Sequence, residues 1–359
     1  MLASANKLRL AAFLFFGSKV RRKFYLRLAA MTENGLGLND VLEVMQQRMK
    51  RKRNPLHLIL TEALERMQSG GSLADSLQGF IPDAEYMLIK SGVDSGDIPN
   101  ALELACGLID AKQKIVTAIT KALSYPALLC GLIVLFLLVV TRYVVPKLSL
   151  IVDPTQWKGS AAVLYSVALF VNSPIGVLTL CAFLGLIATM LATLPHFTGK
   201  ARIVCDKLPP WSLYRLILGS IWLFTLATML KANVQLSVAL DDMLLSAKRN
   251  GWLAERIEAI RAQLNLGKTI GEALDDSGFQ FPDEELVEDL LIYAALPGFD
   301  ARLYSIAEQW LEQGIERIEV QCKAINGGFL VIMLGILCGI GLAVTSLQQQ
   351  IGHSMSTTF

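Results

Sequence analysis

The chain has 359 residues, of which 53% are hydrophobic and only 18% are charged, and its formal net charge is +2. In an ordinary soluble protein about a quarter of the residues are charged. The composition therefore excludes an ordinary soluble protein and indicates membrane segments joined to soluble parts. Six cysteines without paired or CxxC spacing and three scattered histidines favour reduced thiols over a disulfide framework or a zinc site.

The amino-terminal third is polar and basic. Its stretch "LRLAAFLFFG" (8–17) is too short for a signal sequence and is followed by basic residues, so we expect 1–27 to form a basic amphipathic segment on the inner membrane face. Residues 28–124 are predicted to form a first cytoplasmic helical domain. It contains "RMKRKR", which we call the basic stretch, with the cations Arg48, Lys50, Arg51, Lys52 and Arg53. With a membrane so near, contact with anionic lipid, or topology setting, is favoured over nucleic acid, and the stretch is also a candidate partner contact.

Three apolar stretches are long enough to cross a bilayer, at 125–145, 174–194 and 327–347. Residues 161–171 are too short to cross alone, and we expect either an interfacial helix within the loop 146–173 or an extension of the second span. Basic residues are frequent before the first span and return after the second, whereas the tail 348–359 has none. The positive-inside bias therefore predicts a cytoplasmic amino terminus and a carboxyl terminus outside.

One pattern occurs twice. "LAAMTENGLGLNDVLEVM" (28–45) matches "LATMLKANVQLSVALDDM" (226–243) without a gap, and its apolar spacing predicts helices with one buried stripe. Gly35 corresponds to Asn233, and both tolerate the left-handed backbone of a turn between helices. In "GGSLADSL" (70–77) and "GKTIGEAL" (267–274), the Ser or Thr after glycine is a plausible helix N-cap. We therefore predict an all-α fold in which 195–326 is a second cytoplasmic helical-bundle domain homologous to the first.

These motifs, with "SGVDSGDIPNALELA" (91–105) and "KALSYPALL" (121–129), resemble the type II secretion system F / type IV pilus inner-membrane platform protein family. The motif residues with a structural role in that resemblance are Gly70, Gly71, Gly96, Tyr125 and Pro126. The family usually has Gly-Glu where this chain has Gly92-Val93, and the second copy has Gly328 in place of the proline. This drift suggests a type IVb or conjugative pilus branch.

The resemblance implies a multi-pass protein of the bacterial inner membrane that performs no catalysis and needs no cofactor. It would couple a hexameric cytoplasmic assembly ATPase to the polymerisation of pilin or pseudopilin subunits. Other inner-membrane assembly proteins would be further partners, and the chain would be a homo-oligomer. Nucleic acid is not an expected partner.

The residues themselves offer few sites for chemistry. There is no GxxxxGK[ST] loop and no metal-ligand spacing, and "GVDSGD" is better explained by turns than by a loop cation site. The acidic stretch holds Asp283, Glu284, Glu285, Glu288 and Asp289. It fits a helix N-terminus that Pro282 begins, and less readily a docking surface for a basic partner. Gly335 and Gly339 have the small-xxx-small spacing of helix packing.

Two other classes of function stay open. An oligomeric transporter or channel subunit could also be built from a repeat with membrane helices. Such pathways usually keep ionisable residues at depth, whereas the only charge within the three apolar stretches is Arg142, near the end of the first. A membrane-bound enzyme would need a nucleophile–base pair, metal ligands or a phosphate loop, and the sequence shows none of these.

Overall fold

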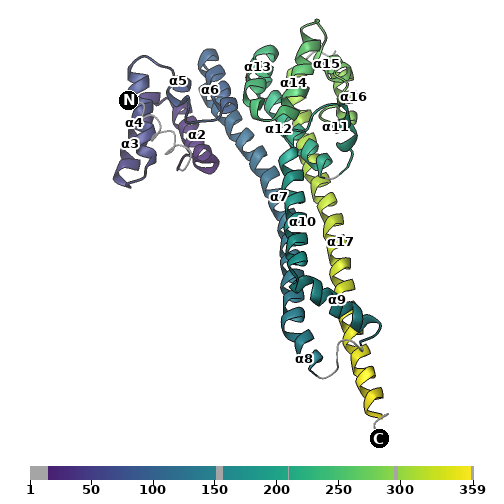
Figure 1. Ribbon diagram of the computed structural model, residues 1–359. Helices are drawn as coiled ribbons and strands as arrows, with labels where there is room; N and C mark the ends of the chain where they lie inside the picture. The colour runs from purple at the N-terminus through teal and green to yellow at the C-terminus, as the bar shows by residue number, and fades with distance from the viewer. Residues whose placement is uncertain (1–14, 151–156, 209, 295–297, 357–359) are drawn as a thin grey trace. The chain divides into compact units, whose positions relative to one another are not determined.

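The computed structural model describes residues 15–150, 157–208, 210–294 and 298–356 (Figure 1). Residues 1–14 of the segment 1–27 that was expected to be amphipathic therefore lie outside the described residues. The chain divides into two compact units. One combines 1–116 with 194–315, and the other combines 117–193 with 316–359. Every regular element in the described ranges is a helix, which confirms the all-α prediction.

The first unit contains the duplication. Its first copy consists of six helices, which are α2 (Ser18–Glu33), α3 (Leu38–Arg51), α4 (Leu56–Gln68), α5 (Leu73–Leu77), α6 (Asp83–Ser95) and α7 (Ile98–Val139). Its second copy has α12 (Trp211–Lys231), α13 (Leu236–Ser246), α14 (Gly251–Leu264), α15 (Ile270–Asp276), α16 (Glu284–Tyr293) and α17 (Phe299–Ser356). The second copy also includes the segment before α12, with a short helix, α11 (Lys200–Cys205). Apart from α11, the two copies, called the first and second repeat below, have the same order of helices.

The turn between the first two helices of each repeat has the same backbone. Gly35 has φ +82° and Asn233 has φ +62°, so both residues take the left-handed conformation expected of them. In each repeat the amide that follows this residue donates to the carbonyl five residues earlier, at 3.1 Å in the first and 3.0 Å in the second. These bonds satisfy carbonyls that the helix end leaves free.

The short helices α5 and α15 both begin with a capping box. The hydroxyls of Ser72 and Thr269 accept from the backbone amides of Asp75 and Glu272, whose carboxylates accept in return from the amides of the cap residues. The predicted N-caps are therefore confirmed. Because each box satisfies two amides that lack partners within the helix, it fixes where a helix of only five to seven residues starts.

The buried stripe predicted from the repeat also forms. Leu28 and Leu42 are fully buried in the first repeat, as are their counterparts Leu226 and Leu240 in the second. In the second repeat the ring of Phe281 lies between two tryptophans, with centroid distances of 5.1 Å to Trp222 and 5.6 Å to Trp252. The second core therefore contains buried tryptophans, whereas the aromatic side chains buried in the first, such as Phe24 and Tyr25, include none.

The second unit holds the end of α7, a π-helical turn (Val140–Val144), α8 (Val145–Ser149), α9 (Ser160–Asn172) and α10 (Pro174–Thr193). Pro146 lacks an amide hydrogen, which accounts for the altered hydrogen bonding of the turn before it. Ser173, with ψ 153°, separates α9 from α10, and a Cβ at Gly176 would lie 1.9 Å from the Phe170 carbonyl oxygen. The stretch 161–171 is therefore a separate helix and does not continue α10 as one straight helix.

Four described helical segments are long and apolar enough to cross a membrane, one more than the sequence analysis expected. They are Ile98–Lys147, Pro174–Thr193, Trp211–Lys231 and Arg302–Ser346. Trp211–Lys231 differs from the others because 61% of its most apolar window is buried within the protein, against 22% or less for the rest. It is α12, the counterpart of α2, and its apolar side chains form the core of the second repeat.

Candidate functional site

The basic stretch lies at the carboxyl end of α3. All five of its cations are exposed, and Arg48, Lys50 and Arg51 occupy the last turn of the helix, where cations complement the helix dipole. Arg53 follows with φ +52°. None of the five forms an ion pair with another described residue, so their charges are available at the surface.

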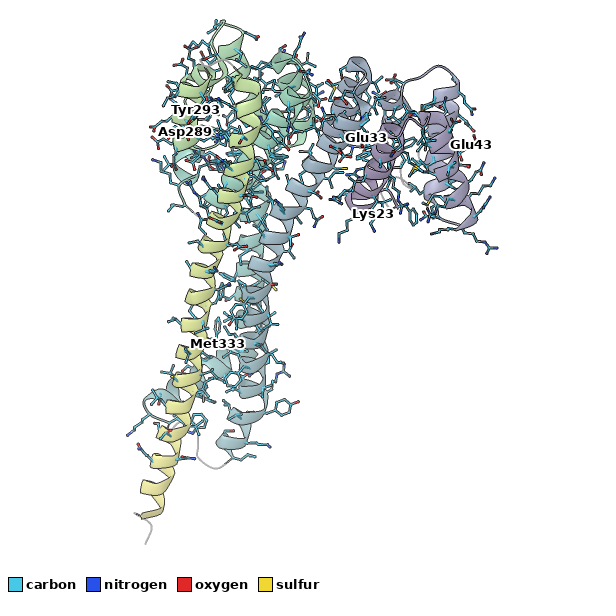
Figure 2. All side chains as sticks on the ribbon, turned by 180° about the vertical axis from the view of Figure 1, so that it is seen from behind. Lys23, Glu33, Glu43, Asp289, Tyr293 and Met333 are labelled. Carbon is cyan, nitrogen blue, oxygen red and sulfur yellow. The ribbon has the colours of Figure 1, made fainter. Side chains whose placement is uncertain are left out.

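The acidic stretch lies at the start of α16. Asp283 is the N-cap position, Glu284 and Glu285 occupy the first turn, and Glu288 and Asp289 are exposed one turn further (Figure 2). Pro282 does not begin the helix as expected, because it precedes the N-cap and lies against α12, where Arg215 Nε donates to its carbonyl oxygen at 3.0 Å. The dipole interpretation accounts for the first-turn acids, whereas Glu288 and Asp289 remain candidates for a partner contact.

The predicted family-motif residues are dispersed along the first repeat. Gly70 and Gly96 have φ of +93° and +76°, and a Cβ at Gly71 would lie 3.0 Å from the Arg66 carbonyl oxygen, so all three serve helix ends. Pro126 lies inside α7, and Tyr125 beside it is 43% exposed. These residues shape the backbone and do not converge on a common site.

Gly335 and Gly339 lie on one side of α17. An added Cβ at either position would meet nothing within 4 Å, so neither glycine is needed for packing inside the chain. Gly339 lines an apolar hollow of about 430 Å³ together with Leu137, Leu164 and Ile340. Packing of these glycines against another helix remains a prediction.

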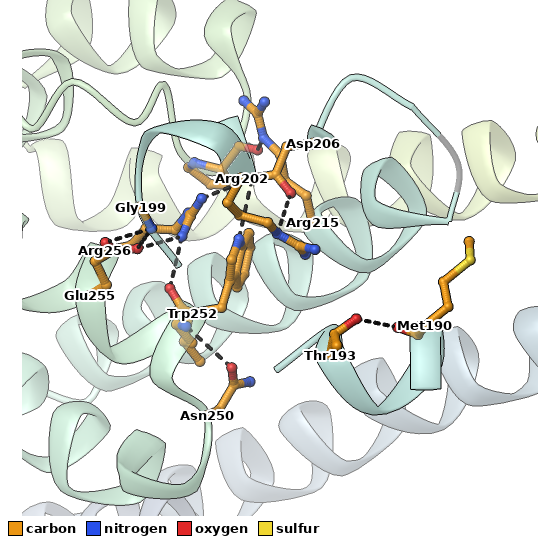
Figure 3. Close-up of polar contacts among 12 residues, drawn as sticks. Met190, Thr193, Gly199, Arg202, Asp206, Arg215, Asn250, Trp252, Glu255 and Arg256 are labelled. Carbon is orange, nitrogen blue, oxygen red and sulfur yellow. Dashed lines mark hydrogen bonds and ion pairs between the residues drawn. The ribbon is translucent and has the colours of Figure 1, made fainter. Parts of the chain in front are cut away.

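A buried charge cluster in the second repeat was not predicted from the sequence. Asp206 lies between Arg256 NH2, at 2.8 Å, and Arg202 Nε, at 3.0 Å, and it also accepts from Trp252 Nε1 at 3.2 Å (Figure 3). All three charged side chains are at most 2% exposed. Two guanidinium groups thus share one buried carboxylate.

Aromatic rings supply part of the remaining environment of these guanidinium groups. The Arg256 guanidinium lies 3.9 Å from the centroid of the Trp252 ring, and that of Arg202 lies 5.7 Å from Tyr214. Burial lowers the pKa of Arg202, and it lowers the pKa of Arg256 to about 10. The two buried cations therefore depend on the carboxylate of Asp206 as their shared counter-charge.

The same cluster fastens the segment that follows α10. Trp252 N donates to Pro195 O at 3.0 Å, and Gly199 N donates to Glu255 Oε1 at 3.1 Å. Together with the Asp206 contacts, these bonds tie residues 195–206 to the first two turns of α14. The chain that leaves the second apolar helix is thus held firmly by the second repeat.

The two repeats also contact each other within the first unit. Ser91 of α6 donates to the carbonyl of Ala232, and the Ser246 hydroxyl donates to Asp83 Oδ2 at 3.2 Å. A pocket of about 410 Å³, lined in part by Lys90 and Asn233, lies along this contact. Burial, with the nearby charge of Asp83, raises the pKa of Asp242 to about 6. The contact between repeats therefore includes two facing carboxylates.

No group of three or more potential metal ligands occurs among the described residues. The features of this protein are instead two helical repeats, their charged surfaces and the long helices that leave them.

A family model described as type II secretion system (T2SS), protein F, matches residues 24–146 and 222–347. The two matches coincide with the two repeats and the apolar segments that end them, and they cover well over half of the chain. The chain belongs to this family. This confirms the resemblance to the pilus and secretion inner-membrane platform proteins seen in the sequence.

A particular relative is the toxin coregulated pilus biosynthesis protein E of Vibrio cholerae. It is 24% identical to this chain over 296 residues, which are 80% of this chain and 84% of that protein. The similarity therefore extends over both repeats and is not confined to one domain.

Proposed function

We propose that the chain is a non-catalytic platform in the inner membrane, which couples a hexameric cytoplasmic ATPase to the polymerisation of pilin subunits. Membership of the secretion family and similarity to a pilus biosynthesis protein support the class of machine. The ATPase, the pilins and other assembly proteins are the proposed partners, and the platform acts as a homo-oligomer.

The proposed coupling rests on the last helix of each repeat. Ile98–Lys147 runs as one helical segment of 50 residues, and α17 runs over 58 residues from the repeat into the apolar stretch. At 1.5 Å per residue, α17 is about 87 Å long. Because no loop separates the repeat from the apolar part, a tilt or rotation of the repeat reaches the membrane part directly.

The proposed topology has three spans, formed by 125–145, α10 and 327–347, with both repeats in the cytoplasm. We assign α12 to the core of the second repeat because of its burial and its correspondence to α2. The only charged residue within the three proposed spans is Arg142, near the end of the first span. Its Nε donates to Asn172 Oδ1 at 3.1 Å. Nothing here favours a transport pathway, which would need polar groups at depth.

The coupling is tested with two insertions of seven residues after Thr120 of α7 in the full-length protein. An alanine-rich helical insertion keeps the phase of the helix within about 20°, whereas a glycine-rich insertion of equal length breaks it. We expect filaments on cells with the helical insertion and none with the flexible one. Copurification of the ATPase of the same machine should be equal for both.

Both variants must be present in the membrane fraction at the wild-type level. Filaments assembled with the glycine-rich insertion would overturn coupling through α7. Failure of the wild-type protein to copurify the ATPase would overturn the platform itself.

We further propose that the exposed acids of α16 contact the ATPase. The double variant Glu288→Lys/Asp289→Lys reverses their charge beyond the first turn, where the helix dipole is weak. We expect at least a tenfold loss of ATPase copurification, with both repeats folded. The control Glu33→Lys/Glu43→Lys makes the same change at exposed positions of the first repeat, and an equal loss there would exclude a specific contact.

A further inference from the structure

The basic residues of α2 lie on two faces of the helix, one of which contacts the rest of the first repeat while the other is exposed. Arg21 forms an ion pair with Glu85 at 2.8 Å, and Arg22 forms one with Asp110 of α7 at 2.5 Å, so both contact their own repeat. Lys19, Lys23 and Arg27 follow at intervals of four residues, are exposed, and make no ion pair with a described residue. This spacing places the three unpaired cations in one row along the helix.

The row on α2 and the basic stretch of α3 lie at the same end of a helical hairpin. The two helices run in opposite directions from the turn at Gly35, so the start of α2 and the end of α3 point the same way (Figures 1 and 2). The exposed acids Glu33, Asp40 and Glu43 lie toward the turn. The hairpin therefore has a basic end with eight unpaired cations, which we call the basic end.

Exposed apolar side chains lie among these cations. Val20 and Leu26 on α2 are 38% and 39% exposed, and Leu58, in the first turn of α4, is 47% exposed. Cations that alternate with apolar side chains fit a lipid surface, because the cations meet headgroup phosphates while the apolar groups enter the boundary below. An acidic protein or a nucleic acid would match the charge but would leave these apolar groups unused.

The second repeat lacks this surface, although its backbone is the same. The positions of Lys19, Lys23 and Arg27 are occupied there by Ile217, Ile221 and Thr225, which are partly or fully buried. The row of cations is therefore no requirement of the helical fold.

The basic end is also tethered to the membrane segment. Arg22 is paired with Asp110, which precedes Tyr125 by 15 residues of α7, or about 22 Å of helix. Such a tether keeps the local concentration of lipid headgroups high, so weak contacts suffice.

We propose that the basic end of the α2–α3 hairpin binds the anionic lipid surface of the membrane that the chain crosses. The first repeat is then held at the bilayer by lipid, while the second repeat is free of that contact and is available to the ATPase. The inference rests on the proposed function only in requiring that α7 enters the bilayer.

The test uses the full-length protein in nanodiscs of phosphatidylcholine, with or without phosphatidylglycerol. Hydrogen exchange is measured by mass spectrometry on peptides within 18–54. We expect exchange at the basic end to be at least about fivefold slower with the anionic lipid, the factor contributed by about one surface cation. High salt should remove the protection, and inorganic phosphate without phosphatidylglycerol should give none.

The variant Lys19→Gln/Lys23→Gln/Arg27→Gln should lose most of this protection. The matched control Lys200→Gln/Lys207→Gln/Lys248→Gln removes the same charge from exposed lysines elsewhere in the first unit, and it should retain the protection. Wild-type exchange that is independent of phosphatidylglycerol overturns the proposal and assigns the basic end to an acidic protein or a nucleic acid. Protection by phosphate alone overturns it in favour of a soluble anion site. Failure of the chain to enter nanodiscs would instead contradict the proposed membrane topology.

Discussion

The two repeats share a backbone but hold buried charge differently. In the first, Glu85 accepts from Arg21 and from the Tyr25 hydroxyl at 2.8 Å each, and the Arg21 side chain keeps 14% of its surface in contact with solvent. In the second, Asp206 faces two arginines that are almost completely buried. The helix caps and turns are retained, while the interior polar groups have diverged. After a duplication, the polar side chains in the core can thus change while the residues that fix helix caps and turns are retained.

The largest difference between the repeats should appear when the central carboxylate is removed. Asp206→Asn removes the carboxylate that the two buried guanidinium groups share, and Arg256 keeps only its longer contact of 3.5 Å with the partly exposed Glu255. We expect a loss of about 3–5 kcal/mol in unfolding free energy. All five tryptophans follow the first repeat in sequence. Four of them lie in the second repeat and Trp157 lies in the second unit, so tryptophan fluorescence during urea unfolding in detergent reports mainly on the second repeat and not on the first.

The comparison variant is Glu85→Gln in the first repeat. It should cost less, about 1–3 kcal/mol, because the partner Arg21 retains solvent contact. Hydrogen exchange of α2 and α6 measures this loss. An equal loss in both variants would show that the two clusters do not differ in the way described.

The contact between the repeats should depend on pH. The pKa of Asp242 is raised to about 6 in the folded protein, so the folded state binds a proton more tightly than the unfolded state does. The contribution of this group to stability is therefore complete below about pH 4 and is lost as the pH rises through 6. Because the side chain is only partly buried and solvent screens its charge, we expect this loss to be about 1–2 kcal/mol.

The measurement is the thermal midpoint between pH 4 and pH 7.5, compared with Asp242→Asn. That variant should lose this pH dependence and be the more stable protein at neutral pH. Asp83→Asn removes the nearby charge and should reduce the dependence without abolishing it. Identical profiles for wild type and Asp242→Asn would contradict the raised pKa.

The left-handed turn offers a smaller test. Gly35→Ala places a Cβ on a backbone with φ +82°, and we expect a loss of about 1–2 kcal/mol. Asn233→Gly should instead stabilise the second repeat slightly, because glycine adopts this conformation without a steric penalty. The denaturation midpoints of the two variants should move in opposite directions. A shift in the same direction would contradict the left-handed conformation of both turns.

The smallest effect concerns the capping boxes. Ser72→Ala removes the hydroxyl that accepts from the Asp75 amide, and we expect a cost of about 1 kcal/mol. The hydrogen bond from the Ser72 hydroxyl is also the largest of the contacts that hold the pKa of Asp75 below its usual value, so this shift should become smaller in the variant. A carboxyl titration by NMR of the wild type and variant would detect it. An unchanged Asp75 titration would show that the box does not persist in solution.

Local signals explain what the sequence could predict. Gly35, Asn233, Ser72 and Thr269 act within a few residues of themselves, so their roles follow from the residue type and its neighbours. The predicted buried stripe likewise depends only on helical spacing. The duplication strengthened each inference, because two independent copies of a weak pattern agree.

The missed features depend on contacts between distant residues. Asp206 and Arg256 are 50 positions apart, and no local pattern marks them as partners. Similarly, α2 runs across residue 27, where the amphipathic segment was expected to end, so its outer row of cations could not be joined to the basic stretch before the hairpin was known. The helix α12 is long and apolar enough to be a span, and its burial and its correspondence to α2 distinguish it from the proposed spans.

The helix α10 has no counterpart in the first repeat, and it changes whether the number of membrane crossings between the two repeats is odd or even. A repeat that ends in one crossing delivers the chain to the opposite side of the membrane. Two such repeats joined directly would therefore face opposite compartments. Under the proposed topology, one additional crossing makes the number between the repeats even, so α10 lets both copies of a duplicated domain work in the same compartment.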